Sequence, residues 1–231
     1  MKLSRILSNQ NGISRKQANA LIAAGRVSIN GQVCRTPSHE VDRFATVRVD
    51  QEVIQTGEAE HYLMLNKPAG YLSATVDDQH KTVLELIAPE LRHHLHIAGR
   101  LDRSSTGLLI LTSNGRWSRQ LTEPVVKIPK VYRVTTAHSI SPETAELFAR
   151  GIWFEFEGLT TSPAQIDQLA EREARVTIYE GRYHQIKRMF HAAGNRVMAL
   201  HRERMGEIKL DCNLGPGAYR SLTREEIMSV Q

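Results

Sequence analysis

The sequence predicts an α+β protein in which a small α/β module precedes a larger domain with a mixed, mostly antiparallel sheet. Short apolar segments that end at Gly, Pro or Asn are mixed with helical patterns, without the regular strand–helix alternation of a doubly wound fold. The chain has 231 residues, 41% hydrophobic and 24% charged, so it is long enough for two unequal domains. Because residues 51–60 are polar, we interpret them as the end of the first module plus a linker, and we place the domain boundary between residues 1–58 and 59–231.

Within the first module, apolar residues at helical spacing predict a short helix over residues 3–7. Ser14 and Gln17 form a capping-box pattern that predicts the start of a second helix. Residues 27–33 contain an Asn-Gly pair between two short alternating segments, which is typical of a tight β-hairpin. Residues 47–50 predict another short strand.

The second domain is predicted from its apolar segments and their terminating residues. Buried strands are expected at residues 62–65 and 108–112, with further strands at 131–136, 175–179, 197–201 and 208–210. Helices are expected at residues 116–122, 142–150 and 184–193, and a last helix begins at Thr223, where Glu226 completes a capping box.

The charge of the chain is unevenly distributed. The net charge is +5, and residues 1–50 hold 8 Lys or Arg against 3 Asp or Glu, which accounts for the whole excess. Residues 143–180 have a net charge of −5, whereas residues 182–204 have a net charge of +5. This asymmetry fits a polyanion bound along one face, with an acidic face turned away from it. Solvated helix faces would give the same pattern, so charge alone leaves both interpretations open.

Several classes of protein are disfavoured. No apolar run approaches the roughly 18–20 residues of a membrane span, and charged residues stand near the amino terminus, where a signal peptide is apolar. Cys34 and Cys212 are far apart, which fits two free thiols in a cytoplasmic protein. His93, His94 and His96 lack nearby ligands at metal spacing, so we favour surface or RNA-facing histidines over a metal site. Nucleotide and cofactor fingerprints are absent, and we predict neither metal nor cofactor.

The segment 99–107 carries the most informative pattern, because Asp102 stands between Arg100 and Arg103 directly before a buried strand. An aspartate in a turn often binds its own backbone, but a carboxylate among cations can also serve as a nucleophile. Two other segments are unusual. Tyr132 lies among cations on a predicted strand, and residues 180–190 place polar groups and cations at a helix start. A core tyrosine and a solvated helix face are the simpler interpretations of these two segments.

Residues 1–50 resemble the S4 RNA-binding domain, through the stretch from Ile13-Ser14-Arg15 to Ile29-Asn30-Gly31. The resemblance implies a small module that binds structured RNA through Arg15, Lys16 and Arg26.

The remaining chain resembles the RsuA branch of RNA pseudouridine synthases, through residues 66–70, 99–109, 130–132 and 181–189. The resemblance implies that a uridine in RNA is isomerised to pseudouridine without a cofactor. It also implies that Asp102 is the nucleophile, that Tyr132 stacks on the extruded base, and that Lys187 pairs with the aspartate, with Arg188 as the alternative. We further expect RNA contacts from Lys67, Arg100, Arg103, Arg182, His184, Gln185, Arg188, Arg202 and Arg204.

Residues 114–118 and 201–206 are most similar to the members of this branch that modify the small ribosomal subunit. The expected partner is therefore 16S ribosomal RNA or a small-subunit assembly intermediate, bound by a monomer away from any membrane. Three alternatives stay open: the same reaction on large-subunit or transfer RNA, a non-catalytic RNA-binding or ribosome-assembly protein, and an enzyme that cleaves the glycosidic bond without re-forming it.

Overall fold

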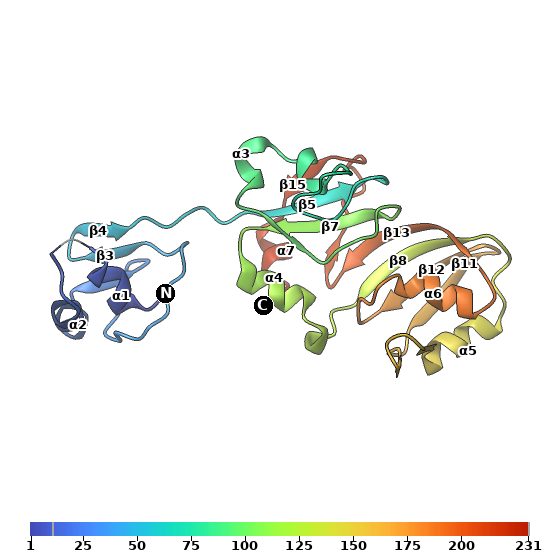
Figure 1. Ribbon diagram of the computed structural model, residues 1–231, viewed down its shortest axis with the longest axis horizontal. Helices are drawn as coiled ribbons and strands as arrows, with labels where there is room; N and C mark the ends of the chain where they lie inside the picture. The colour runs from blue at the N-terminus through green and yellow to red at the C-terminus, as the bar shows by residue number, and fades with distance from the viewer. Residues whose placement is uncertain (11, 231) are drawn as a thin grey trace. The chain divides into compact units, whose positions relative to one another are not determined.

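The computed structural model describes residues 1–10 and 12–230 and divides the chain into two compact units, Met1–Glu60 and His61–Gln231 (Figure 1). Each unit has its own hydrophobic core.

The first unit packs two helices against a four-stranded antiparallel sheet with the strand order β2-β1-β3-β4. Its elements are α1 (Leu3–Ser8), α2 (Arg15–Ala23), β1 (Val27–Ile29), β2 (Gln32–Val33), β3 (Val47–Val49) and β4 (Glu52–Gln55). The predicted helices, hairpin and strand over 47–50 are confirmed. Residues 51–60, interpreted as the end of the module plus a linker, contain β4, which forms the edge of the sheet and whose exposed or half-buried residues show little apolar alternation.

Local chemistry explains these elements. The Ser14 side chain accepts a hydrogen bond from the Gln17 backbone N–H, and the Gln17 side chain accepts one from the Ser14 backbone. Asn30 and Gly31 both have positive φ, 48° and 82°, as a type I′ hairpin turn requires. This turn pairs the last residue of β1 with the first of β2.

The second unit is built on a nine-stranded sheet whose main path is β11-β12-β8-β13-β7-β5-β15. The β13–β7 pair is parallel, and the other strand pairs of this sheet that the structure describes are antiparallel, so the predicted fold class is confirmed. The strands are β5 (Tyr62–Lys67), β6 (His96–Ala98), β7 (Thr106–Thr112), β8 (Lys130–Thr136), β11 (Gln165–Ala170), β12 (Glu173–Ile178), β13 (Val197–Met205), β14 (Ile208–Lys209) and β15 (Tyr219–Ser221).

Helices and a separate hairpin complete this unit. They are η1 (Val83–Leu86), α3 (Pro89–Arg92), α4 (Gly115–Thr122), η2 (Pro124–Val126), α5 (Glu143–Arg150), β9 (Trp153–Phe154), β10 (Leu159–Thr160), α6 (Gln185–Ala192) and α7 (Arg224–Met228). The four helices expected in this domain are present, and the Thr223 capping box is confirmed.

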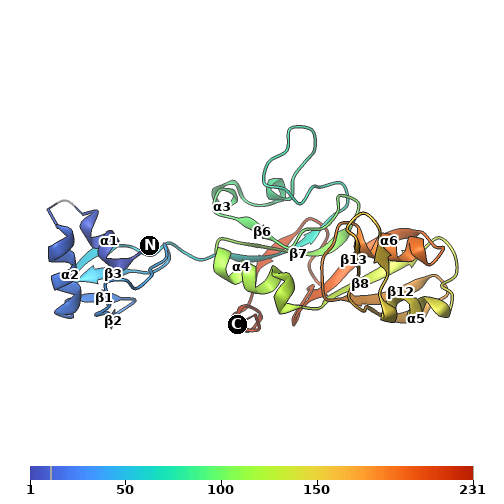
Figure 2. The same ribbon diagram turned by 60° about the horizontal axis from the view of Figure 1, so that its bottom comes forward.

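The sheet is buried on both faces around β7. Leu109 and Leu111 join one core with Val83 and Leu84 of η1, and this core continues under α5 and α6 over the half of the sheet that contains β8, β11, β12 and β13. Leu108 and Ile110 join a second core, which is covered by α4 and the carboxyl-terminal segment (Figures 1 and 2). Burial on both faces explains why this strand is apolar without alternation. Among the described residues, no helix is long and apolar enough to cross a membrane.

Gly107 lets β7 and β13 approach closely. Its φ is +100°, and a Cβ atom added there would lie 2.4 Å from the Arg202 carbonyl oxygen. Only glycine fits this position without strain. The contact brings the loop that precedes β7, with Asp102 in it, next to β13 and β8.

Candidate active site

Asp102 lies in the loop between β6 and β7, and its side chain is 24% exposed. The Lys187 ammonium, in the first turn of α6, donates a hydrogen bond of 2.8 Å to Asp102 Oδ2 and one of 3.1 Å to Ser104 Oγ. His184 Nε2 lies 3.5 Å from the other carboxylate oxygen. The loop and the helix therefore place two basic groups against one half-buried carboxylate.

Arg188 points elsewhere. Its guanidinium makes a bidentate pair with Glu157, with hydrogen bonds of 2.6 and 2.7 Å, and lies 3.6 Å from the ring centroid of Phe154. The hydrogen bonds from Arg188 hold the pKa of the Glu157 carboxyl below its usual range. Of the two cations considered from the sequence, Lys187 is thus the one that contacts Asp102.

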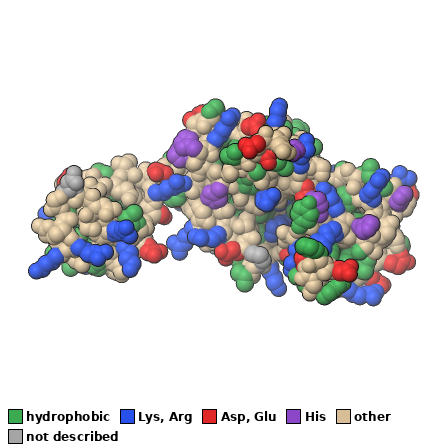
Figure 3. Space-filling view, viewed as in Figure 1, with side chains coloured by type: hydrophobic (Ala, Val, Ile, Leu, Met, Phe, Trp, Pro, Cys, Tyr) green, Lys and Arg blue, Asp and Glu red, His purple; other side chains and the backbone are tan. Residues whose placement is uncertain are grey.

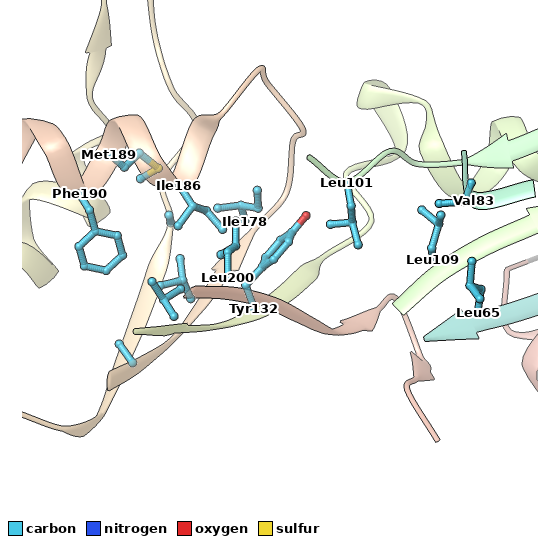
Figure 4. Close-up of a cluster of buried hydrophobic side chains, with 14 of the residues drawn as sticks. Leu65, Val83, Leu101, Leu109, Tyr132, Ile178, Ile186, Met189, Phe190 and Leu200 are labelled. Atoms are coloured by element: carbon cyan, nitrogen blue, oxygen red, sulfur yellow. The ribbon is translucent and has the colours of Figure 1, made fainter. Parts of the chain in front are cut away.

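Tyr132 forms a wall of a pocket that also contains Asp102. Its side chain on β8 is 6% exposed and packs among apolar residues, with its hydroxyl directed towards Leu101 (Figure 4). The polar lining of the pocket consists of Arg100, Asp102, Ser105, Arg182, His184 and Gln185. The apolar lining consists of Leu101, Tyr132, Ile178, Ile186 and Leu200. An aromatic wall facing a carboxylate and cations suits a flat, polar ligand such as a nucleobase.

Arg202 corrects one expectation, because it is 1% exposed and does not lie on an RNA-binding surface. Its guanidinium donates to backbone carbonyls, at 2.8 Å to Leu108 O, 3.0 Å to Gly99 O and 3.4 Å to Arg100 O. Its Nη1 also lies 3.4 Å from the Tyr132 hydroxyl. The side chain is internal because β13 alternates, and position 202 faces the same side as the buried Leu200.

Lys67, also expected at the RNA surface, is fully buried at the end of β5. Its ammonium donates to the carbonyls of Pro68 at 3.0 Å, Arg103 at 3.3 Å and Ser105 at 2.8 Å. Burial lowers the pKa of Lys67 to about 8, although the charge of Asp102 opposes this shift.

Together, Arg202 and Lys67 hold the Asp102 loop from its two sides. Arg202 binds carbonyls before Asp102, and Lys67 binds carbonyls after it. Ser73 adds a third attachment, since its hydroxyl contacts both Leu101 N at 3.0 Å and Leu101 O at 2.7 Å. Hydrogen bonds from charged donors are stronger than neutral ones, so these contacts hold the Asp102 loop rigidly in place.

The other expected RNA-binding residues occupy different settings. Arg100 and Arg103 are exposed on the Asp102 loop, and Arg182 pairs with Glu180 at 3.0 Å. Gln185 is 3% exposed and donates to Glu180 at 2.7 Å, so it supports the start of α6 instead of presenting a surface group.

Four further residues lie outside this pocket. Arg204 lies in a separate hollow lined by Arg175 and Lys209. In the first unit, Arg15 and Lys16 are exposed at the start of α2, whereas Arg26 pairs with Asp50.

Sequence reasoning missed three supporting residues. Ser104 stands inside the Asp102 motif and could have been included, but Ser73 and Glu157 are distant in sequence and carried no local signal. Within residues 1–10 and 12–230, no three His, Cys, Asp or Glu side chains form a group that could hold a metal ion.

Known protein families match both units of this chain, and relatives and a solved structure match it over its whole length. The sequence matches the RNA pseudouridylate synthase family over residues 61–192 and the S4 domain over residues 1–47. It is 50% identical to ribosomal small subunit pseudouridine synthase A of Pseudomonas aeruginosa and 42% identical to the protein of that name from Escherichia coli (strain K12), and each alignment covers 100% of both chains.

A crystal structure of a pseudouridylate synthase matches with a TM-score of 0.73 and 36% identity, covering 100% of each chain. Both resemblances noted in the sequence are confirmed. The chain therefore belongs to the RNA pseudouridylate synthase family, a family of isomerases that act on RNA, and carries an S4 domain at its amino-terminal end.

Proposed function

We propose that this protein converts a uridine of 16S ribosomal RNA to pseudouridine, with Asp102 as the nucleophile. The main observation that supports this proposal is that the Asp102 carboxylate lies 2.8 Å from the Lys187 ammonium, in a pocket with Tyr132 as one wall. The names of the relatives, which refer to the small ribosomal subunit, support this substrate. In this proposal the protein acts as a cytoplasmic monomer and needs no cofactor.

The reaction requires an exposed nucleotide. The bond between uracil N1 and the sugar C1′ breaks, the base turns, and a bond forms between C5 and C1′. The proton on C5 is released to solvent, and N1 takes up a proton, so the reaction is balanced without any oxidant or group donor. A stacked uridine must first leave its helix, which costs a few kcal/mol.

The pocket offers compensation for that cost. The Tyr132 ring supplies a face on which the uracil stacks, worth roughly 1–3 kcal/mol. Lys187 pairs with Asp102 and holds its carboxylate in position in the half-buried loop. We therefore expect Tyr132→Phe to retain RNA binding and to lose rate only if the hydroxyl transfers a proton, whereas Tyr132→Leu should lose more.

The amino-terminal domain, residues 1–58, would dock the enzyme on folded RNA through Arg15 and Lys16. Both are exposed at the start of α2. Each phosphate contact removed by Arg15→Gln or Lys16→Gln should flatten the slope of log affinity against log salt by about 0.7–0.9. An unchanged slope would remove this surface from the RNA interface.

Release of tritium from RNA labelled at uridine C5 tests the main proposal. The purified protein should release tritium from 16S ribosomal RNA, and pseudouridine should be missing at one position in cells that lack the protein. Tritium release from large-subunit or transfer RNA alone would show that this RNA, and not 16S ribosomal RNA, is the substrate. Free uracil would indicate cleavage without isomerisation, and binding without either product would leave an RNA-binding protein.

A further inference from the structure

Tyr183 is an exposed aromatic residue adjacent to His184, and it was not among the site residues predicted from the sequence. Its side chain is 75% exposed, yet its ring stacks on the His184 ring with a centroid distance of 3.9 Å and an interplanar angle of 17°. His184 Nε2 is in turn 3.5 Å from Asp102 Oδ1. The stacked pair thus leads from the pocket to solvent.

The backbone holds this pair in place. His184 has φ +50°, a left-handed conformation that is uncommon for residues other than glycine. The Tyr183 carbonyl accepts a hydrogen bond of 3.3 Å from Arg188, and Arg188 is itself fixed by its bidentate pair with Glu157. Tyr183 is therefore mounted on an ordered helix start and is not a loose surface side chain.

The surroundings favour a nucleic acid over an apolar partner. Arg182 and Lys187 flank the pair along the chain, and Arg100 and Arg103 are exposed on the Asp102 loop. The space-filling view shows hydrophobic, Lys, Arg and His side chains close together, with some Asp and Glu among them, on the face over the α6 half of the second unit (Figure 3). An aromatic ring among cations is the combination that binds single-stranded RNA, by stacking on a base and neutralising phosphates.

Extruding a uridine also leaves its neighbours in the strand with an uncovered face. From these observations we propose that Tyr183 stacks on the base that adjoins the extruded uridine and so replaces the lost stacking partner. The inference rests on the proposed function, because it places the extruded uridine beside Asp102.

The test compares Tyr183→Ala and Tyr183→Phe with wild type, after the modified uridine has been mapped. Phe156→Ala is the matched control, since Phe156 is 97% exposed, lies between β9 and β10, and is not among the residues that line the Asp102 pocket. Substrates are a fragment of 16S ribosomal RNA labelled with tritium at C5 and two versions with an abasic nucleotide, one on each side of the target. Tritium release gives KM and kcat for each pair.

Tyr183→Ala should raise KM by roughly 5- to 150-fold, the equivalent of one lost base–aromatic stack, and should leave kcat within about threefold. Tyr183→Phe and Phe156→Ala should stay near wild type. On one of the two abasic substrates, the KM of wild type should rise by the same factor relative to the intact fragment. The KM of Tyr183→Ala should not rise further on that substrate.

A Tyr183→Ala variant within twofold of the wild-type KM would overturn the inference. An equal rise in KM for Tyr183→Ala relative to wild type on both abasic substrates would also overturn it, because this result would show that Tyr183 acts only by supporting His184. If wild type itself released no tritium, the proposed function would fail instead, so the two failures are distinguishable.

Discussion

The protonation of Lys67 should affect both stability and catalysis, because this buried ammonium holds the loop that follows Asp102. Its pKa is lowered from 10.5 to about 8, mainly by burial. The unfolded chain therefore binds the proton more tightly than the folded protein does. Below about pH 8 the full cost of burying the charge is present, and between about pH 8 and 10.5 that cost is relieved as pH rises.

The size of the effect follows from the shift. One pKa unit corresponds to about 1.4 kcal/mol, so the change from 10.5 to about 8 is worth on the order of 3 kcal/mol across the whole window. Between about pH 7.5 and about pH 9.5, Lys67 should raise the free energy of unfolding by about 2 kcal/mol. Lys67→Met should lack this part of the pH dependence.

Lys130 supplies the matched control. It is 8% exposed and its pKa is also lowered by burial to about 8, but its ammonium donates to Ile128 O at 2.9 Å and not to the Asp102 loop. Urea unfolding over the pH range should show that Lys67→Met and Lys130→Met each lose a share of the pH dependence. Tritium release should fall in Lys67→Met alone. If Lys67→Met kept the full pH dependence, or if both variants lost activity equally, this account of Lys67 would be refuted.

Three further predictions concern the active site and its support. Asp102→Asn should abolish tritium release while RNA affinity, measured by filter binding, stays within about threefold, and appreciable turnover would exclude Asp102 as nucleophile. Lys187→Met should slow single-turnover tritium release by about 100-fold or more. Arg188→Met should mainly lower the free energy of unfolding measured in urea, by about 1–3 kcal/mol. Equal rate losses in the two variants would contradict the pairing of Lys187 with Asp102. Gly107→Ala should lower the free energy of unfolding by at least about 3 kcal/mol. The control Gly158→Ala should lower it by only about 1 kcal/mol, because Gly158 also has a positive φ but open space around it. Equal melting temperatures of the two variants would argue against the close contact between Gly107 and Arg202.

The elements that sequence predicted well are those fixed by local chemistry. The Ser14 and Thr223 capping boxes and the Asn30-Gly31 turn each satisfy backbone groups within a few residues, so their patterns are visible in a short window. The elements that were missed depend on distant partners. β11 is an example, because most of its residues are exposed and it exists through pairing with β12. Its sequence therefore carries no apolar alternation that a strand prediction could use.

In the candidate active site, too, the residue within a continuous motif was predicted, whereas its partner depends on contacts between distant parts of the chain. Asp102 stood out because its motif is continuous, but the residue that pairs with it comes from α6, and adjacent residues of a helix point in different directions. Lys187 and Arg188 were both plausible by charge. Only the tertiary contacts separate them, since the β9–β10 hairpin brings Glu157 and Phe154 to Arg188 and leaves Lys187 for Asp102.

Two cations that were expected to contact RNA, Lys67 and Arg202, are buried, so charge alone did not predict their function. Lys and Arg are rarely buried, so a count assigns them to the surface. Yet Arg202 faces the same side as Leu200, and this period of two along β13 is visible in the sequence once the strand is extended beyond residue 201. For Lys67 no such clue exists, because β5 is buried on both faces. The positive charge of the 182–204 segment therefore overstates what RNA can contact, since the Arg202 charge is used internally to position the loop that carries Asp102.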